Sequence, residues 1–436
     1  MKAAVAQLAE HTRDRRAALP QLSRPLVEPF QLRYDQPRNS RHTCGAGAYA
    51  LSSTAAPRPT TLVRVLHSAS AIPRGQWDAL ARRGYHRHAW FVAAEACGAE
   101  ARHIGVFDKH KTLVALIPAY IERETLHGDL HARWFGPTQR IAAALGARLR
   151  PSLAIGAPMS TGSDPMGSDS VLTDSVLEHA LTLLDEEARD ERLKAIVWPF
   201  IGEDAQTIRE VAQRLGFRES FANSEAVVDV DWSSPEEYIN SRSKNVRRTL
   251  RNELAWVHDQ GIRVSWETDL RPLASSFDAF YRASYVARNR RVANLSPQFF
   301  EELAAQKSPG VRVQCAWKGT TLLEMAVALD AGGALDLCLS AQSEETRNGL
   351  LYQHCLCYDP IRVAIADRLT RIHLGPSALY PKLVRGARLQ TRLTLVRGLT
   401  PAARAAIAVL APVTNVRNRA KQRRLVGKLA GAISAT

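Results

Sequence analysis

Cysteine is scarce in this sequence, with six residues among 436. Two of them stand together in the Cys-x-Cys of residues 355–357, and the chain has no Cys-x-x-Cys pair. Small disulfide-stapled domains and zinc ribbons both need paired cysteines, so this scarcity excludes those classes. The first 21 residues also contain no apolar signal core. We therefore expect a cytoplasmic protein whose thiols stay reduced.

Long apolar runs are also absent. The sequence contains no run of about 18 uncharged apolar residues, so it predicts no membrane-spanning helix. Hydrophobic residues still make up 45 % of the chain, which is typical of a globular protein. At 436 residues the chain is too long for one ordinary hydrophobic core, and this length predicts two or three domains.

Acidic residues are missing from the C-terminal end. Residues 386–436 hold ten Lys and Arg and no Asp or Glu, and residues 1–60 hold nine basic and four acidic residues. Residues 61–385 hold 39 of each sign, so the net charge of +15 comes from the two ends. The basic tail, especially 415–431, can contact RNA or an anionic membrane surface. Because it attracts any polyanion, it does not define the chemistry.

The first 60 residues differ from the rest. They mix Pro, Arg, Ser and Ala without a sustained period, as in RYDQPRNSRHTCGAGA (33–48), and this composition predicts a disordered extension. The predicted organisation is an extension at 1–60, a first domain at 61–225, a second domain at 226–400 and a basic tail at 401–436.

Two similar series of elements occupy the two predicted domains. Each runs in the order strand, helices, antiparallel strands, helix and strand, which predicts an α+β fold with mixed, mostly antiparallel sheets flanked by helices. The repeated order indicates an internal duplication. The first series is expected at 62–68, 75–83, 88–98, 102–122 (two strands and a turn), 176–188, 194–200 and 204–217. The second is expected at 226–232, 234–261, 262–268, 275–289, 296–306, 311–317, 321–330, 334–341, 348–368 and 371–375.

The second series has the order of an acyltransferase fold: a helical pair, a three-strand meander, a helix and a short strand that ends at a glycine, as in the GNAT fold. The stretch LYQHCLCYDPIRVAIADRLTRIHLGPSALYPKLVRGA (351–387), preceded by SRSKNVRRTLR (241–251), resembles the Fem-like GNAT acyltransferases. Within this stretch the pattern Gly-x₄-Tyr-x-Lys-x₃-Gly is formed by Gly375, Tyr380, Lys382 and Gly386. This resemblance covers about 62–397 and implies two GNAT-like domains in tandem.

The resemblance also implies a reaction. Fem-like proteins transfer an acyl or aminoacyl group to an amine and form an amide, with aminoacyl-tRNA or acyl-CoA as the donor. We therefore expect an N-acyltransferase with no tightly bound cofactor. Its acceptor is a small-molecule or peptide amine: a cell-wall (peptidoglycan) precursor, a secondary metabolite and a protein amine all fit. The alternatives are an acyl-CoA-dependent N-acetyltransferase and a non-catalytic, RNA- or membrane-associated protein of the same fold. The oligomeric state stays open.

The loop expected to bind a donor phosphate is incomplete. GNAT proteins that use acetyl-CoA usually carry Arg/Gln-x-x-Gly-x-Gly/Ala before the central helix, where backbone amides bind pyrophosphate. The corresponding stretch, SEETRNGLLYQ (343–353), has Arg347 and Gly349 alone from that pattern. This departure weakens ordinary CoA binding and leaves room for tRNA, another carrier or an altered CoA pose. Arg347, Gly349 and Gly375 remain candidate donor-binding residues.

Lys382 is the first candidate for a catalytic role. The resemblance implies that a lysine in this pattern contacts the acyl donor or the developing oxyanion, where a cation stabilises the growing charge. A solvated surface lysine is the alternative. Tyr380 can position the substrate or donate a proton, although packing is the favoured interpretation.

Two further residues complete the catalytic set. The resemblance implies a tyrosine on the central helix as general acid for the leaving group, a role for which Tyr352 and Tyr358 compete. Glu324 stands in an apolar strand, where a partly buried carboxylate has a raised pKa and can deprotonate the incoming amine. Strand alternation also permits a solvated face for Glu324, and we favour that interpretation.

The segment YQHCLCY (352–358) combines a histidine with two cysteines. On a helix His354 and Cys357 share a face, but zinc needs about four ligands and the chain has no second matching cluster. A thiol nucleophile would need a base and an oxyanion donor. We therefore predict no metal site and favour a buried helix face that packs on the meander.

Basic side chains gather in the predicted 234–261 helix. Three of them share a helical face at i, i+4 and i+7, with a fourth beside them. A second basic cluster, Arg288, Arg290 and Arg291, lies at the end of the predicted 275–289 helix. Both can hold a phosphate-rich donor, tRNA or CoA, whereas an exposed face balanced by nearby acids is the alternative. The candidate residues are Lys244, Arg247, Arg248, Arg251 and Arg288.

Overall fold

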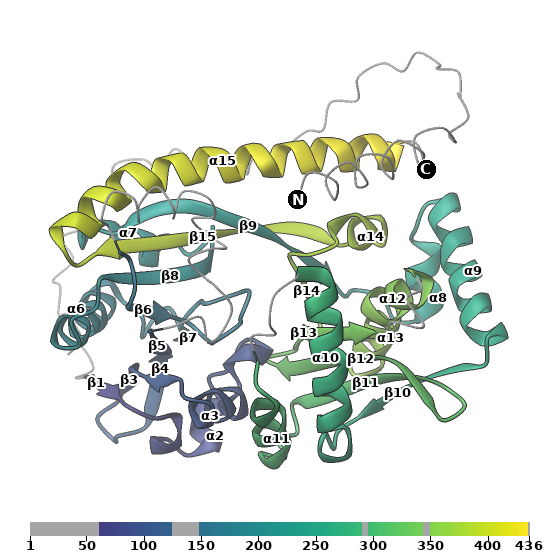
Figure 1. Cartoon of the computed structure of the whole chain (residues 1–436), viewed down its shortest axis with the longest axis horizontal. Helices are drawn as coiled ribbons and strands as arrows, with labels where there is room; N and C mark the ends of the chain where they lie inside the picture. The colour runs from purple at the N-terminus through teal and green to yellow at the C-terminus, as the bar shows by residue number, and fades with distance from the viewer. Residues whose placement is uncertain (1–60, 124–147, 290–294, 343–348, 435–436) are drawn as a thin grey trace, which may run out of the picture. The chain divides into compact units, whose positions relative to one another are not determined.

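The computed structural model describes residues 61–123, 148–289, 295–342 and 349–434 (Figure 1). Within these ranges, side chains are described except at 286–289 and 428–434. The predicted extension at 1–60 and the candidate Arg347 lie outside the described residues.

Two β-sheets organise the described residues. The smaller has the order β1 (Leu62–Leu66), β3 (His103–Phe107), β4 (Leu113–Ile117) and β7 (Met166–Gly167). The larger has eleven strands in the order β10 (Ile262–Glu267), β11 (Val311–Lys318), β12 (Thr321–Ala331), β13 (Ala334–Gln342), β14 (Arg371–Gly375), β9 (Arg218–Asp229), β15 (Arg388–Gly398), β8 (Ala195–Gly202), β6 (Ser152–Ile155), β5 (Ala119–Glu122) and β2 (Glu100–Ala101). This sheet runs through residues of both predicted domains.

Helices flank the sheets. The α-helices are α2 (Arg74–Asp78), α3 (His88–Ala96), α6 (Asp174–Asp190), α7 (Gln206–Arg214), α8 (Pro235–Asn240), α9 (Lys244–Asp259), α10 (Ala274–Asn289), α11 (Pro297–Ala305), α12 (Gly349–Gln353), α13 (Asp359–Ala366), α14 (Leu379–Val384) and α15 (Pro401–Ser434). Short segments are η2 (Ala69–Ala71), η3 (Gly84–His86), η4 (Arg271–Leu273) and the π-helical η5 (His354–Tyr358). The predicted α+β class with mostly antiparallel strands is confirmed.

Parallel pairing joins β6 to β8 and β13 to β14, whereas the other described strand pairs are antiparallel. A helix separates the partners of each parallel pair in sequence, namely α6 for the first and α12 with α13 for the second. Such a pair needs a crossover of this kind. The repetition agrees with an internal duplication. The predicted boundary at 225/226 falls inside β9, and the division into two domains stays a prediction.

Apolar periodicity explains which faces are buried. In α6 the apolar residues that recur at helical spacing are the buried ones, as expected for an amphipathic helix. Strand β8 is a continuous apolar run and is buried at every position, as expected for a strand covered on both faces. They share one hydrophobic cluster. A second cluster packs α8, α13 and α14 onto β9 and β14, and includes Ala226, Ile372, Leu374 and Leu379. It places α14 against the end of β14.

The predicted 234–261 helix is two helices, α8 and α9. Ser234 caps α8 by accepting a hydrogen bond from Glu237 N at 3.1 Å, as the Ser-Pro start predicts. The interruption coincides with Ser241, whose Oγ donates to Tyr238 O at 2.7 Å. This local bond competes with helix continuation. The basic residues therefore begin at the N-terminus of a separate helix.

The predicted basic tail forms the long helix α15, which lies along the larger sheet (Figure 1). Its residues Ala403, Ile407 and Leu410 are buried against Val197 and Val396. The sequence did not predict this helix because apolar residues lie on its outward side as well as on the side that packs on the sheet, and so mark no single face. None of the described helices is long and apolar enough to cross a lipid bilayer.

Candidate active site

The parallel strands β13 and β14 separate after a short contact. They pair at Ala334 with Arg371, at Leu335 with Ile372 and at Asp336 with His373, and at no later position. β13 then continues to Gln342 beside β12, and β14 ends at Gly375. Beyond this pairing the edge of β13 is not joined to β14, and we call the region between the diverging strands the opening. The unpaired edge of β13 can hydrogen-bond an extended ligand there.

Lys382 lies at the end of β14. Its Nζ donates to Leu374 O and, at 3.5 Å, to Gly375 O. Only 2 % of the residue is exposed, so the alternative of a solvated surface lysine is wrong. Burial lowers the pKa of the ammonium to about 8, although Cys357 and Glu225 oppose that shift. Lys382 is therefore a buried cation, charged in most molecules at neutral pH.

A buried ion pair holds the helix that carries Lys382. Arg385 follows α14, and its guanidinium donates to Glu253 of α9 and to Gln353 of α12. Burial raises the pKa of Glu253, although Arg385 opposes the rise. Arg385 Nη1 also donates to Pro381 O at 3.0 Å. Three helices thus meet at Arg385, which restricts the position of Lys382.

Glu324 lies on β12 opposite Gln342, the last residue of β13. Gln342 Nε2 donates to Glu324 Oε2 at 2.8 Å. The residue is 1 % exposed, so the favoured solvated-face interpretation is wrong. Strand alternation alone allowed the Glu324 side chain to lie on either face of the sheet. The helical segment η5 packs on β12, and Glu324 is buried. The buried-carboxylate alternative, with Glu324 near the far end of the opening, is the one that fits.

Of the three candidate tyrosines, Tyr352 and Tyr380 are half-buried. Tyr352 packs beside Cys357 and Leu337, and Leu337 is the first β13 residue after the pairing with β14 ends. Tyr380 packs at the margin of the cluster under α14. Tyr358 is buried, and this burial raises its pKa. Tyr352 is therefore the tyrosine that borders the opening.

The Cys-x-Cys segment is a packed helix turn. Cys355 and Cys357 are buried in η5, and burial raises the pKa of both thiols. An activated nucleophile needs a lowered pKa, so the thiol-nucleophile alternative lacks support. The packing interpretation fits the geometry.

Four neighbouring strands place one polar side chain each in a buried row that the sequence did not predict. The residues are Asp336 on β13, His373 on β14, Glu225 on β9 and Arg392 on β15. His373 Nδ1 lies 3.5 Å from Glu225 Oε2, and Arg392 Nη2 donates to the same oxygen at 2.7 Å. The row crosses the sheet at the position where β13 and β14 begin to separate.

Arg83 covers this row from the other half of the chain. Its Nη2 lies 2.8 Å from Glu225 Oε1 and 2.5 Å from Asp336 Oδ1, and all three residues are buried. Gly84 N also donates to Asp336 Oδ2 at 2.6 Å. A side chain at Gly84 would collide with Leu329, because a Cβ there would lie 2.3 Å from the Leu329 Cβ.

The network is ionised. Burial tends to raise the pKa of Glu225, but Arg83 and His373 outweigh it and hold that pKa well below its usual range. Burial likewise tends to raise the pKa of Asp336, but Arg83 outweighs this effect, so the pKa is lowered. Burial and then Arg83 lower the pKa of His86 to about 4. The carboxylates are therefore negative at neutral pH, and His86 is neutral.

Glu225, Asp336 and His373 offer ligand atoms within 4.8 Å of one another, a spacing that would suit a metal ion. Arg83 Nη2 already bonds oxygens of both carboxylates. A guanidinium and a metal cation would repel each other at such a distance. The arrangement is that of an ion-pair network, and the prediction of no metal is kept.

A loop of the first half reaches the same network. Thr161 Oγ1 donates to Glu225 Oε1 at 2.8 Å, and Asp164 accepts from Arg392 Nη1 at 3.2 Å. Trp198 Nε1 holds the loop by donating to Ser163 O at 2.8 Å. The Asp164 side chain is 34 % exposed, so the network reaches solvent at this residue.

The basic face of α9 is partly balanced. Arg251 pairs with Glu236 at 3.1 Å, and Arg247 Nη1 donates to two backbone oxygens. Lys244 and Arg248 are exposed and form no ion pair with a described residue. These two remain candidates for donor binding.

The glycine candidates and Arg288 lie in different elements. Gly349 begins α12, and Gly375 ends β14 with a φ of +73°, a left-handed conformation that glycine adopts without strain. Arg288 lies on α10, and its side chain is outside the described set.

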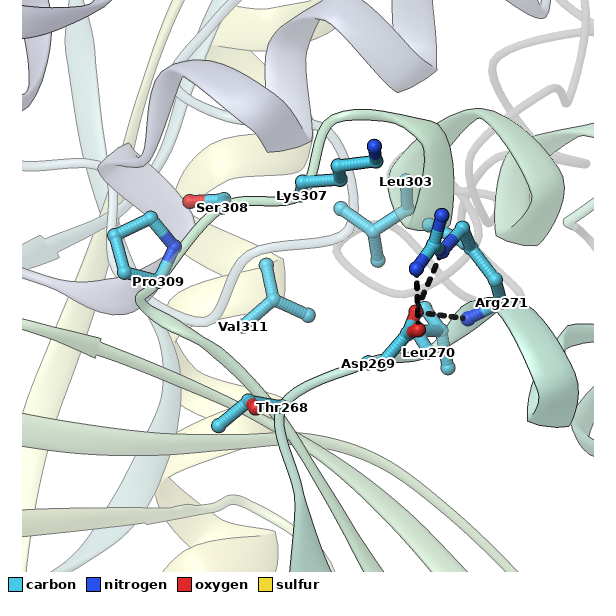
Figure 2. Close-up of a pocket in the computed structure, with 10 residues that line it drawn as sticks. Thr268, Asp269, Leu270, Arg271, Leu303, Lys307, Ser308, Pro309 and Val311 are labelled. Carbon is cyan, nitrogen blue, oxygen red and sulfur yellow. Dashed lines mark hydrogen bonds and ion pairs between the residues drawn. The ribbon is translucent and has the colours of Figure 1, made fainter.

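A pocket of about 370 Å³ lies elsewhere, between the end of β10 and α11 (Figure 2). Asp269 and Arg271 form an ion pair at its rim, at 2.6 Å. The pocket contains none of the candidate catalytic residues. The opening is therefore the candidate active site, because the buried cation of Lys382 lies at the end of β14.

The larger sheet, with its separated parallel pair, is GNAT-like. This chain belongs to the FemAB-like family, whose model, described as peptidoglycan biosynthesis and recognition, matches residues 68–425. The Fem-like resemblance is thereby confirmed.

Several solved structures are similar to this chain, and that of FemX shows the fold. The crystal structure of FemX covers 76 % of this chain and 96 % of its own, at 13 % identity and a TM-score of 0.52. The C-terminal domain of a putative lysylphosphatidylglycerol synthetase from Agrobacterium fabrum covers 74 % and 91 %, at 11 % identity and 0.46. A tandem GNAT protein from the clavulanic acid biosynthesis pathway covers 78 % and 99 %, at 10 % identity and 0.43. No curated protein in the comparison matches this chain.

Proposed function

We propose that this protein is a Fem-like N-acyltransferase that forms an amide bond in the opening between β13 and β14. One observation carries the proposal: in a FemAB-like chain, a buried lysine cation lies at the carbonyl end of β14, where the two parallel strands separate.

Lys382 is suited to stabilise an oxyanion. An ammonium has three N–H donors, and the carbonyls of Leu374 and Gly375 accept two of them. In the proposed mechanism the third donates to the oxygen of the substrate carbonyl. The amine nitrogen attacks the carbonyl carbon, the C–N bond forms and negative charge grows on that oxygen. A preorganised cation in a site that excludes water lowers the barrier to this step.

Two further groups complete the reaction. Glu324, near the far end of the opening, takes the proton from the attacking amine. Tyr352 gives a proton to the leaving oxygen or sulfur as the ester or thioester bond breaks. The products are the amide and a neutral hydroxyl or thiol. Transfer of the proton from Glu324 to the Tyr352 oxygen through solvent restores both groups, so atoms and charges balance. No covalent enzyme intermediate is needed.

The family description points to a first acceptor to test, an amine of a peptidoglycan-precursor peptide. The exposed Lys244 and Arg248 on α9 favour a phosphate-rich donor, and aminoacyl-tRNA is the donor we propose. Acyl-CoA is the alternative.

The test is a binding and transfer experiment with the full chain. Binding of acetyl-CoA and of a charged tRNA pool is titrated at near-physiological and high salt, and transfer of a labelled aminoacyl group to an amine-bearing precursor peptide is then measured. The variant Lys244→Gln/Arg248→Gln removes two charges from α9. The matched control, Lys109→Gln/Lys111→Gln, removes two exposed charges from the turn between β3 and β4.

We expect salt-sensitive tRNA binding and label in the peptide. Each phosphate contact contributes about 0.7–0.9 to the slope of log affinity against log salt concentration. The α9 variant, which removes two contacts, should therefore reduce this slope by about 1.4 to 1.8, and the control should leave it unchanged. Salt-resistant CoA binding with acetyl transfer would establish the alternative donor. Binding of neither donor, with no transfer, would contradict the proposed function.

A further inference from the structure

Helix α15 is fixed on the sheet in one orientation. Asn415 Oδ1 accepts a hydrogen bond from Phe221 N at 2.9 Å, and Asn418 Nδ2 donates to Phe221 O at 3.0 Å. The Arg419 guanidinium lies over the Phe221 ring, 5.4 Å from its centroid. Because one face is bonded and packed to β9 and β15, the opposite face points outward.

The outward face is apolar. Val409, Val413 and Val416 are 65 %, 49 % and 68 % exposed, and they recur at i, i+4 and i+7, which places them on one side of the helix. The exposed alanines Ala405 and Ala420 extend the stripe. Single exposed apolar residues are ordinary, but a stripe along one helix indicates an interaction surface.

Basic residues continue the stripe. Arg423 stands seven residues after Val416 and therefore on nearly the same side, next to the exposed Lys421 and Arg424. None of these three forms an ion pair with a described residue, and the chain from 386 to 436 contains no acidic residue. The outward face is therefore apolar in its first half and positively charged in its second.

We infer that α15 binds the surface of an anionic lipid bilayer. The valines would enter the boundary between headgroups and acyl chains, and the basic residues would bind lipid phosphates. Charge selects this occupant: a second copy of the helix would bring like charges together. A nucleic acid would be drawn to the arginines but would gain little from the valines. This inference does not depend on the proposed transfer reaction.

The test is flotation of the full chain with vesicles of phosphatidylcholine alone or with 30 % phosphatidylglycerol, about the anionic content at which such a helix should bind. Two variants address the two parts of the face: Val409→Gln/Val413→Gln/Val416→Gln, and Arg423→Gln/Arg424→Gln. Lys109→Gln/Lys111→Gln is the charge-matched control, and Leu62→Gln replaces an exposed leucine on β1. Circular dichroism and thermal melting verify that each variant folds.

We expect flotation with the anionic vesicles alone. Each α15 variant should weaken it roughly tenfold or more, the valine variant by the loss of buried apolar groups and the arginine variant by the loss of charge, and both controls should leave it unchanged. The inference is overturned by no vesicle binding, by equal binding to neutral vesicles, or by equal loss in the controls. Retention of a tRNA pool by the valine variant, with no flotation of the unmodified chain, would assign the face to RNA instead.

Discussion

Arg83 Nη2 lies 2.5 Å from Asp336 Oδ1, although 253 residues separate the two in sequence. The same nitrogen lies 2.8 Å from Glu225 Oε1. These pairs join the segment before η3 to β13 and β9, the neighbours of β14. The strands that form the opening are thus held in place by a guanidinium from the other half of the chain.

Replacing Arg83 with methionine should be strongly destabilising. Arg83→Met leaves the buried carboxylates of Glu225 and Asp336 short of a cation, and the loss of one partner from such a pair costs about 3–5 kcal/mol. Urea denaturation, followed by circular dichroism, measures the change in the free energy of unfolding.

Arg82 provides the matched control, since it is adjacent in sequence and exposed. Arg82→Met should change the free energy of unfolding by less than about 0.5 kcal/mol. Equal stabilities of the two variants would show that the buried network does not stabilise the fold.

The pH dependence of stability should report the burial of Lys382. Its folded pKa of about 8 is below the unfolded value of about 10.4, so between these values the unfolded chain binds more protons. The contribution of Lys382 to stability therefore rises with pH across this window, by about 3 kcal/mol at 1.36 kcal/mol per pH unit. Below pH 8 the cost of the buried charge is fully present.

Because thiols and tyrosines titrate in the same window, the informative quantity is a difference. The free energy of unfolding of the wild type minus that of Lys382→Met should rise from pH 8 to pH 10.5. A flat difference curve would mean that Lys382 is not buried as a cation.

Thiol labelling should distinguish packed from reactive cysteines. Cys315, Cys355 and Cys357 are buried, whereas Cys97 and Cys338 are half-buried, and burial raises the pKa of all five thiols. Mass mapping after brief treatment with iodoacetamide should find label at Cys97 in the native protein and at Cys315, Cys355 and Cys357 only after unfolding. Cys97→Ser should remove that label and leave the rest unchanged. Rapid native labelling of Cys357 would revive the thiol-nucleophile alternative.

The sequence predicted the elements from α10 to β14 well, because their apolar residues recur at helical or strand spacing. Lys382 was singled out through the resemblance to the Fem-like enzymes. β15 was not predicted, since Arg388, Arg392 and Arg397 interrupt its apolar pattern.

The buried network could not be found in the same way. Asp336 and His373 each stand as a single polar residue between apolar neighbours, Glu225 follows the polar Asn223 and Ser224, and the three lie far apart in the chain. Strand order alone aligns them, since β14 lies between β13 and β9. Arg83 is one of two consecutive arginines, and nothing in the sequence distinguishes the buried one from the exposed one.

The most direct test of the account is the single-turnover rate of transfer in Lys382→Met, at a donor concentration that saturates the wild type. If the Lys382 cation stabilises the oxyanion, the rate should fall about 10²–10³-fold, while donor affinity stays close to that of the wild type and circular dichroism shows that the variant is folded. A rate within about threefold of the wild type, or a loss confined to donor affinity, would contradict a catalytic role for Lys382.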